Sequence, residues 1–374
     1  MAGQLDHDNG TLSEPGRVLR RGWTTGACAA AASRATYQAW LTGRFPDPVT
    51  LRLPGGAQPS FRLALSERDA EEARAGIVKD AGDDPDITHG ALVISAVRPA
   101  PRGSGIVFRA GPGVGTVTRP GLPLAVGEPA INPGPRRMIA AALAELTGDA
   151  MPPDLIVTIS IPGGEALAAK TLNGRLGIVG GLSVLGTSGI VIPYSCSSWI
   201  HSIHRGIDVA RAAGIAHIAA ATGSTSEAAA AQLHSLPEIA LIDMGDFVGG
   251  TLKYLRHHPV SRLTLAGGFG KLAKLACGHL DLHSARSRLD LGWLADRLTE
   301  TGTPAASIAA ASAAAGAGEV LAIARSAGPH CAERFAHLIA TQAREVALAT
   351  LAGTVAVDVA VFDRDGSLIG HAGP

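Results

Sequence analysis

The sequence predicts a mixed α+β domain joined to an α/β domain, followed by an Ala-rich helical region that ends in a β-hairpin. Three observations lead to this prediction. Short strand-like runs with few helices between them fill the first part of the chain. Strands then alternate with helices, which implies parallel pairing with right-handed crossovers. Long stretches of small side chains follow, and 374 residues suffice for such an organisation.

We expect four segments: a flexible extension over 1–17, the α+β domain over 18–150, the α/β domain over 151–283, and the helical region with its hairpin over 284–374. In the first domain, a helix is predicted over 25–41, where Gly43 ends it. Strands are predicted over 49–54, 60–66, 90–97 and 105–110. A helix over 133–146 closes the domain, and "MPPD" marks its boundary.

The second domain begins with a buried strand over 154–160. A glycine-rich stretch and a helix over 195–213 precede three strand–loop–helix units at 216–233, 238–255 and 261–276. Ligands in such sheets bind beyond the carboxyl ends of the strands. This rule places six residues along one rim: Gly223, Asp243, Asp246, Gly267, Gly268 and Gly270. The terminal hairpin is expected to turn at Asp365-Gly366.

Composition narrows the class of function. The chain has 32 basic and 32 acidic residues, so it carries no net positive charge that would attract nucleic acid. Any anionic ligand must therefore be bound by local groups. Four cysteines without a CxxC pair argue against a disulfide framework and a structural zinc site. The polar N-terminus is no signal peptide, and the stretch 305–324 lacks the residues of a membrane span. We expect a cytoplasmic protein without a membrane partner.

The stretch "RGWTTGACAAAA" (21–32) combines a helix start with a cysteine. Thr24 or Thr25 can cap the helix through its hydroxyl. Cys28 lacks a neighbouring base, which a nucleophilic thiol requires. A buried helix start is therefore favoured, and contact of Thr24, Thr25 and Gly26 with an anionic ligand is the alternative.

The densest acidic cluster, "KDAGDDPDITHG" (79–90), contains Asp80, Asp83, Asp84 and Asp86. It does not match the calcium-binding loop. Turn chemistry would use some of these aspartates in a solvated turn. Alternatively, carboxylates packed together have raised pKa values and serve as general bases. These four residues are our candidate catalytic carboxylates.

Several motifs suggest anion binding without defining a known site. Gly111, Gly113 and Gly115 are not followed by a helix, so a dinucleotide site is rejected. "GGFGKLAK" is no phosphate-binding loop of the Walker type, although its helix start can receive a carboxylate or phosphate. His201 and His204 lack the spacing of zinc proteases. Arg136 and Arg137, in the first turn of the helix over 133–146, are either surface residues or ligands of a carboxylate. Arg119 lies beside a backbone-lined loop, and Arg175 lies in a glycine-rich stretch that either wraps a ligand or forms tight turns.

Five blocks in order resemble the CbiD family, the cobalt-precorrin-5B C1-methyltransferases. They are "RGWTTGACAAAA", "VKDAGDDPDITHGA", "GPGVGTVTRPGLPLAVGEPAINPGPRRMI", "LNGRLGIVGGLSVLGTSGIV" and "GGFGKLAKLACGHLDLHS". The resemblance runs from about Leu19 to the final hairpin. The family commonly has Tyr in place of Trp23 and Thr in place of Ala27, and the second difference removes a hydroxyl near the helix start.

The resemblance implies a Rossmann-like, methyltransferase-type second domain. It also implies S-adenosylmethionine-dependent methylation of C1 of cobalt-precorrin-5B to cobalt-precorrin-6A, in anaerobic cobalamin biosynthesis. On this basis the aspartates of 79–90 remove or relocate a proton of the ring. The carboxylates of the tetrapyrrole are bound by Thr24, Thr25, Arg119, Arg136, Arg137 and Arg175. The rim residues bind the S-adenosylmethionine.

Cobalt arrives within the substrate, so no protein-bound metal is expected. The alternative function is a non-catalytic tetrapyrrole carrier, which needs no adenosine site. A nicotinamide-dependent reductase is disfavoured, since no GxGxxG with a later acidic residue follows a strand. The sequence is compatible with a homo-oligomer.

Overall fold

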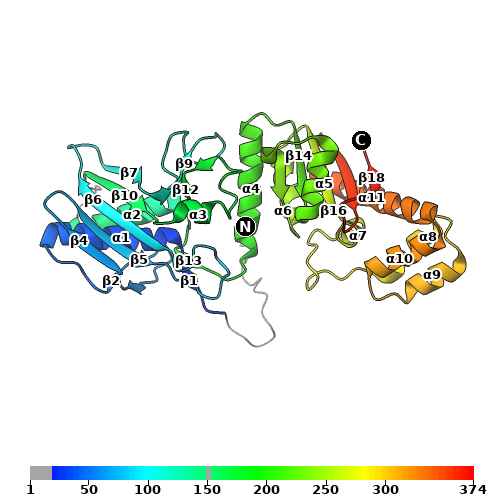
Figure 1. Cartoon of the computed structure of the whole chain (residues 1–374), viewed down its shortest axis with the longest axis horizontal. Helices are drawn as coiled ribbons and strands as arrows, with labels where there is room; N and C mark the ends of the chain where they lie inside the picture. The colour runs from blue at the N-terminus through cyan, green and yellow to red at the C-terminus, as the bar shows by residue number, and fades with distance from the viewer. Residues whose placement is uncertain (1–18, 149–152) are drawn as a thin grey trace, which may run out of the picture. The chain divides into compact units, whose positions relative to one another are not determined.

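The computed structural model describes residues 19–148 and 153–374, which form two compact units, Met1–Cys196 and Ser197–Pro374 (Figure 1). The extension predicted over 1–17 lies outside the described residues. The two units are described separately below. None of the helices in the described parts of the chain is long and apolar enough to cross a membrane.

The first unit is built around the predicted N-terminal helix, α1 (Thr25–Thr42). The hydroxyl of Thr24 accepts a hydrogen bond from the Ala27 amide at 3.1 Å, and Gly43 ends the helix with a φ of 76°. Its alanines and Cys28 are fully buried. Because these side chains are small, α1 packs closely against the sheet and against α2 (Pro133–Thr147).

The sheet of the first unit contains a strand that the sequence placed in the second domain. Its spatial order is β4 (Leu65–Arg68), β5 (Ala73–Val78), β6 (Leu92–Pro99), β10 (Leu155–Ser160), β7 (Ile106–Ala110). β10 is antiparallel to β6 and parallel to β7. Leu155, Val157 and Ile159 lie in the core of the first unit. The boundary therefore lies after Cys196 and not at residue 150.

Short ladders complete the first unit. They pair β1 (Gly22–Trp23) with β13 (Ile190–Val191), β2 (Val49–Thr50) with β3 (Ser60–Phe61), β8 (Gly113–Val114) with β12 (Gly181–Leu182), and β9 (Thr116–Val117) with β11 (Ile178–Val179). The predicted strands 49–54 and 60–66 are thus shorter than expected, and β5 was missed. The glycine-rich stretch after α3 (Gly164–Ala168) contains β11, β12 and β13, and each of them pairs with a strand from much earlier in the sequence.

The second unit contains the predicted alternation of strands and helices. Its sheet has the order β15 (Leu241–Asp243), β14 (His217–Ala221), β16 (Arg262–Gly268), β17 (Ala356–Phe362), β18 (Leu368–Ala372). The first four strands are parallel. The predicted terminal hairpin is present, but β17 pairs with β16, so the hairpin extends this sheet. Mixed α/β architecture is therefore confirmed.

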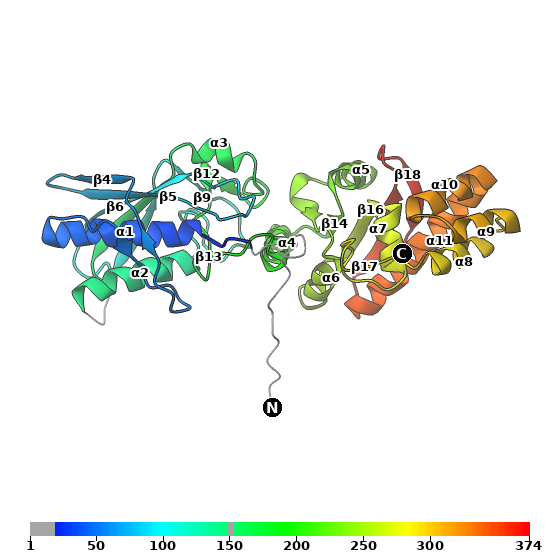
Figure 2. The same cartoon turned by 90° about the horizontal axis from the view of Figure 1, so that it is seen from below.

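Helices cover both faces of this sheet (Figure 2). Alternate residues of the strands belong to two apolar clusters, one with α5 and the other with α6, α7 and α11. The connecting helices are α5 (Ser224–His234), α6 (Val248–His257) and α7 (Phe269–Ala276), with a 3₁₀ turn at Glu238–Ala240. The remaining helices are α4 (Cys196–Ala212), α8 (Leu291–Thr299), α9 (Ala305–Ser312), α10 (Ala317–Ala327) and α11 (Pro329–Leu351).

Candidate functional site

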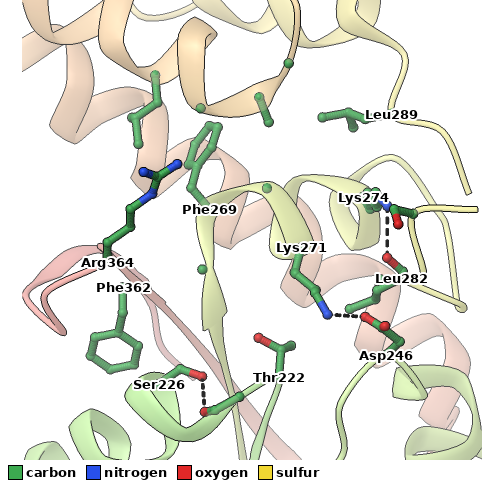
Figure 3. Close-up of a pocket in the computed structure, with 18 of the residues that line it drawn as sticks. Thr222, Ser226, Asp246, Phe269, Lys271, Lys274, Leu282, Leu289, Phe362 and Arg364 are labelled. Carbon is green, nitrogen blue, oxygen red and sulfur yellow. Dashed lines mark hydrogen bonds and ion pairs between the residues drawn. The ribbon is translucent and has the colours of Figure 1, made fainter.

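A pocket of about 1260 Å³ lies at the carboxyl ends of the parallel strands in the second unit (Figure 3). Thr222 follows β14, Gly268 ends β16 and Phe362 ends β17, and all three line the pocket. Asp246, which follows β15, lies at its side. The strand ends thus bring together segments that are far apart in the sequence, at the edge where open α/β sheets bind ligands.

Three helices begin at this pocket. α5, α7 and α10 have Gly223, Gly268 and Gly316 at their N-caps, and none of the three helix starts has a side-chain cap. The first amides of a helix have no partner within the helix and carry partial positive charge. These helix starts therefore present amide donors to an anionic ligand.

The fold does not itself require glycine at these N-caps. Their φ values are 172°, −70° and 179°, which any residue adopts. A Cβ atom at Gly223, Gly268 or Gly316 would meet no heavy atom within 4 Å. The space in front of each helix start is therefore open, and a side chain there would occupy the volume of a ligand.

The pocket has an excess of positive charge. Five cations line it: Lys271, Lys274, Arg288, Arg325 and Arg364. Asp246 binds Lys271, and Asp363 binds Arg325 at 2.7 Å. Among the described residues, no carboxylate pairs with the other three cations. Burial lowers the pKa of Lys274, whose Nζ donates to the Leu282 carbonyl at 2.9 Å. The pocket is therefore suited to an anionic ligand.

The structure separates the six predicted rim residues into two groups. Gly223, Asp246, Gly268 and Gly270 line the pocket, whereas Gly267 and Asp243 do not. A Cβ at Gly267 would lie 2.8 Å from Thr222 Oγ1, so this glycine is needed for packing and its assignment to a ligand is corrected. The Asp243 carbonyl accepts a hydrogen bond from Trp199 Nε1 at 3.2 Å.

Sequence reasoning missed the unpaired cations and Gly316. Arg288, Arg364 and Gly316 belong to segments predicted as a helical region and a hairpin, and nothing in the sequence pattern places these segments beside β16. Lys274 lies in the helix of the third predicted strand–loop–helix unit. One sequence signal could have placed Arg364. The strand-like run before Asp363 forms β17, and when β17 pairs with β16 its last residue lies next to Gly268.

The acidic loop 79–90 does not behave as predicted. The Arg20 guanidinium binds Asp80 at 2.5 and 2.9 Å and, with the Gly82 amide, lowers the pKa of that carboxyl to about 2. Burial alone would raise the pKa of Asp86, but Lys79 and Thr88 outweigh it and the pKa is lowered. The expectation of raised pKa values is therefore wrong for these two residues, because cations face them.

The other two aspartates of this loop bind backbone amides. Asp83 accepts a hydrogen bond from the Arg20 amide at 2.8 Å, and Asp84 accepts one from the Tyr194 amide at 2.8 Å. The Trp23 amide donates to the Asp80 carbonyl at 2.7 Å. The loop thus connects the segment before α1 with the segment before α4.

Asp86→Asn is expected to destabilise the first unit by about 3–5 kcal/mol, because it leaves a charged Lys79 buried without its partner. Lys79 is only 2 % exposed. Urea titration followed by hydrogen exchange at β5 measures the loss. Asp69→Asn, in an exposed turn, is the control, and equal midpoints for the two variants would contradict this account.

The start of α1 is closed to ligands. Thr24 and Thr25 are 7 % and 4 % exposed, and the Gly26 amide donates to the Leu185 carbonyl at 2.9 Å. The predicted contact of these threonines with a ligand is therefore corrected, because the loop before β13 covers the helix start. Burial raises the pKa of the Cys28 thiol to about 12, which excludes a thiolate nucleophile there.

The predicted arginines take different positions. Arg119 donates to the Arg175 carbonyl at 3.3 Å, so the fold brings these two residues together. Arg136 donates to Glu128 and to the Ile131 carbonyl, each at 2.7 Å, and lies over the Phe108 ring. This arginine therefore stabilises the start of α2, and its role as a free carboxylate ligand is corrected. Arg137 is exposed on the same helix.

The fold and the pocket define the class: an α/β protein with a cationic pocket at the carboxyl edge of a parallel sheet. The chain belongs to the CbiD family. The family model described as CbiD matches residues 12–193, and the model described as CbiD, C-terminal domain, matches residues 281–373.

Curated relatives match nearly the whole chain. A protein named cobalt-precorrin-5B C(1)-methyltransferase from Bradyrhizobium sp. is 58% identical over 95% of this chain and 94% of its own. A protein of the same name from Paramagnetospirillum magneticum is 57% identical over 95% of this chain and 99% of its own. A solved structure, the cobalamin biosynthesis protein (cbiD) from Archaeoglobus fulgidus, is 27% identical, with a TM-score of 0.37 over 72% of this chain and 83% of that chain.

Proposed function

We propose that this chain transfers a methyl group from S-adenosylmethionine to carbon C1 of cobalt-precorrin-5B, giving cobalt-precorrin-6A in anaerobic cobalamin biosynthesis. The names of relatives at 57–58% identity over almost the whole chain support this function. The structural observation that carries it is the pocket with three helix starts and an excess of cations. The comparisons lend no support to a carrier without catalytic activity. We place the reaction in the cytoplasm.

The three unpaired cations of the pocket are the proposed ligands of the tetrapyrrole. This substrate carries acetate and propionate groups, and Lys274, Arg288 and Arg364 offer charged donors to such carboxylates. Pockets for one drug-sized ligand occupy about 300–1,000 Å³. A volume of about 1260 Å³ therefore suits a large ligand or two ligands held together.

The edge of the pocket that contains Gly223, Gly268 and Asp246 is the proposed site of the methyl donor, in keeping with a Rossmann-like second unit. Gly223 and Gly268 let the donor approach the backbone, and Asp246 is placed to bind ribose hydroxyls while its Oδ1 binds Lys271. Helix amides suit the donor's carboxylate. Cations do not suit the sulfonium, so we assign the unpaired cations and the glycines to different ligands.

The protein's contribution to the reaction is binding, orientation and exclusion of water. The sulfonium supplies a methyl group on a good leaving group, so the chain must align the methyl with the nucleophilic ring carbon. Fixing the carboxylates of the macrocycle at several cations restricts its rotation in the pocket. The methyl moves to C1 and the sulfur keeps the bonding electron pair.

Asp84 is the proposed base for any ring proton that must be relocated, because cations bind Asp80 and Asp86 and lower their pKa values, which makes them weak bases. Asp84→Asn is expected to lower turnover by about 10²–10⁴-fold while the melting temperature changes little. Single-turnover transfer from labelled donor measures this. Asp83→Asn is the matched control, and transfer at the wild-type rate by Asp84→Asn would remove Asp84 from the mechanism.

The function is tested by incubating the purified full chain with cobalt-precorrin-5B and methyl-labelled S-adenosylmethionine without oxygen. We expect one added methyl at C1 by mass spectrometry and NMR. Tight binding of the tetrapyrrole without transfer, and without binding of S-adenosylmethionine, would favour the carrier instead.

A further inference from the structure

A second cluster of polar side chains lies in the second unit at the amino end of the sheet, opposite to the strand ends that line the pocket. His217 opens β14, His234 ends α5, and Asp358 lies in β17. One ligating atom from each of these three residues lies within 4.8 Å of the others. His371 of β18 faces the same carboxylate. Asp358 is fully buried, so water does not satisfy this charge.

Hydrogen bonds account for only part of the cluster. Asp358 Oδ1 accepts from Arg262 Nε at 2.8 Å, and Oδ2 accepts from Thr264 Oγ1 at 2.8 Å. Thr264 Oγ1 lies 2.8 Å from His217 Nε2. Among the described residues, no well-aligned hydrogen bond reaches the buried Nε2 atoms of His234 and His371. Two imidazole nitrogens therefore converge on a carboxylate oxygen without a proton aligned between them.

The distances are also those of ligands that share a cation. Asp358 Oδ2 lies 3.2 Å from His234 Nε2 and 3.7 Å from His371 Nε2, longer than the roughly 2.7–2.9 Å of a charged N–H···O bond. Ligand atoms about 2.0–2.2 Å from a tetrahedral zinc ion lie roughly 3.4 Å apart. Burial also lowers the pKa values of His217 and His234, which favours the neutral imidazoles that bind metals.

We propose that His217, His234 and Asp358, with His371 as a fourth ligand, bind a divalent transition-metal ion of the zinc class. Arg262 and Thr264 hold the carboxylate in place, as outer partners of metal ligands do. The ion connects the end of α5 and the last strand to the centre of the sheet, which makes the site structural. This reverses the expectation of a chain without a bound metal. The sequence contains no metal motif because the four ligands come from separate elements.

The test uses the untagged full chain, freed of metal with a chelator and titrated with Co²⁺ alone. Visible absorption of tetrahedral Co²⁺ is expected to saturate at one ion per chain, and Zn²⁺ is expected to displace it. His234→Gln and His371→Gln should each weaken Co²⁺ binding at least about 100-fold. His330→Gln is the control, because His330 is 86 % exposed on α11, and it should bind as the wild type does.

Absence of Co²⁺ absorption in the wild type, or wild-type affinity for Co²⁺ in both variants, would overturn the proposal and indicate a proton-linked polar cluster instead. Circular dichroism checks that each variant is folded. A thermal midpoint that rises with Zn²⁺ in the wild type and in His330→Gln, but not in His371→Gln, gives a second readout. No rise in the wild type would also overturn the proposal. Neither measurement depends on the methyl-transfer reaction.

Discussion

Gly268→Ser is expected to weaken donor binding and so slow methyl transfer, while leaving the fold of the second unit intact. Serine is a favourable N-cap residue, and Gly268 has an ordinary φ of −70°, so the start of α7 keeps its conformation. The new Cβ meets no heavy atom of the described residues within 4 Å, and Gly268 lines the pocket, so the side chain enters the volume assigned to the ligand. We expect donor affinity to fall at least about tenfold, a loss of about 1.4 kcal/mol or more. Calorimetric titration with S-adenosylmethionine measures it.

The matched control is Gly55→Ser in the first unit. Gly55 also has open space around its Cβ position and no left-handed φ, but it belongs to the first unit and does not line the pocket. The free energy of unfolding should change by less than about 0.5 kcal/mol in both variants. Wild-type donor affinity and turnover in Gly268→Ser would show that no ligand approaches this helix start.

Lys274→Met is expected to weaken tetrapyrrole binding by about 10–100-fold. A hydrogen bond to a charged group contributes about 1.5–3 kcal/mol, and this lysine has no carboxylate partner among the described residues. Methionine keeps much of the apolar stem, so packing beside Leu282 is retained. Arg364→Met, on the hairpin after β17, should have an effect of similar size. Equilibrium titration with the tetrapyrrole at several salt concentrations measures both.

Lys253→Met, on the exposed side of α6, controls for the loss of one positive charge. Binding by the wild type should weaken as salt increases, and less steeply in Lys274→Met, because fewer ion pairs form. If Lys274→Met and Arg364→Met bind the tetrapyrrole with the same affinity as Lys253→Met, the unpaired cations of the pocket do not bind the substrate.

Local sequence rules predicted much of the fold. The threonine cap and Gly43 locate α1, and the alternation of strands and helices locates β14, β15 and β16. The failure at β10 has a physical reason. An apolar run such as 155–160 fits any buried strand position, and only its pairing with β6 and β7 assigns it to the first unit.

The candidate sites were less predictable than the fold. The rule for strand ends placed Gly223, Asp246 and Gly268 at one edge, because it depends only on strand direction. Other positions depend on which distant segments pack around β16. They are those of the cations Arg288 and Arg364 and of the cluster around Asp358. The aspartates of 79–90 were misjudged because Arg20, which binds Asp80, comes from a distant part of the sequence, and because the motif does not show that Lys79 is buried against Asp86.

Hydrogen exchange of the full chain, with and without S-adenosylmethionine and cobalt-precorrin-5B, tests most directly where the ligands bind. We expect slower exchange at the starts of α5, α7 and α10, at residues 223–227, 268–272 and 316–320, when both ligands are present. Protection confined to the first unit, with these three helix starts unchanged, would contradict the assignment of methyl transfer to this pocket.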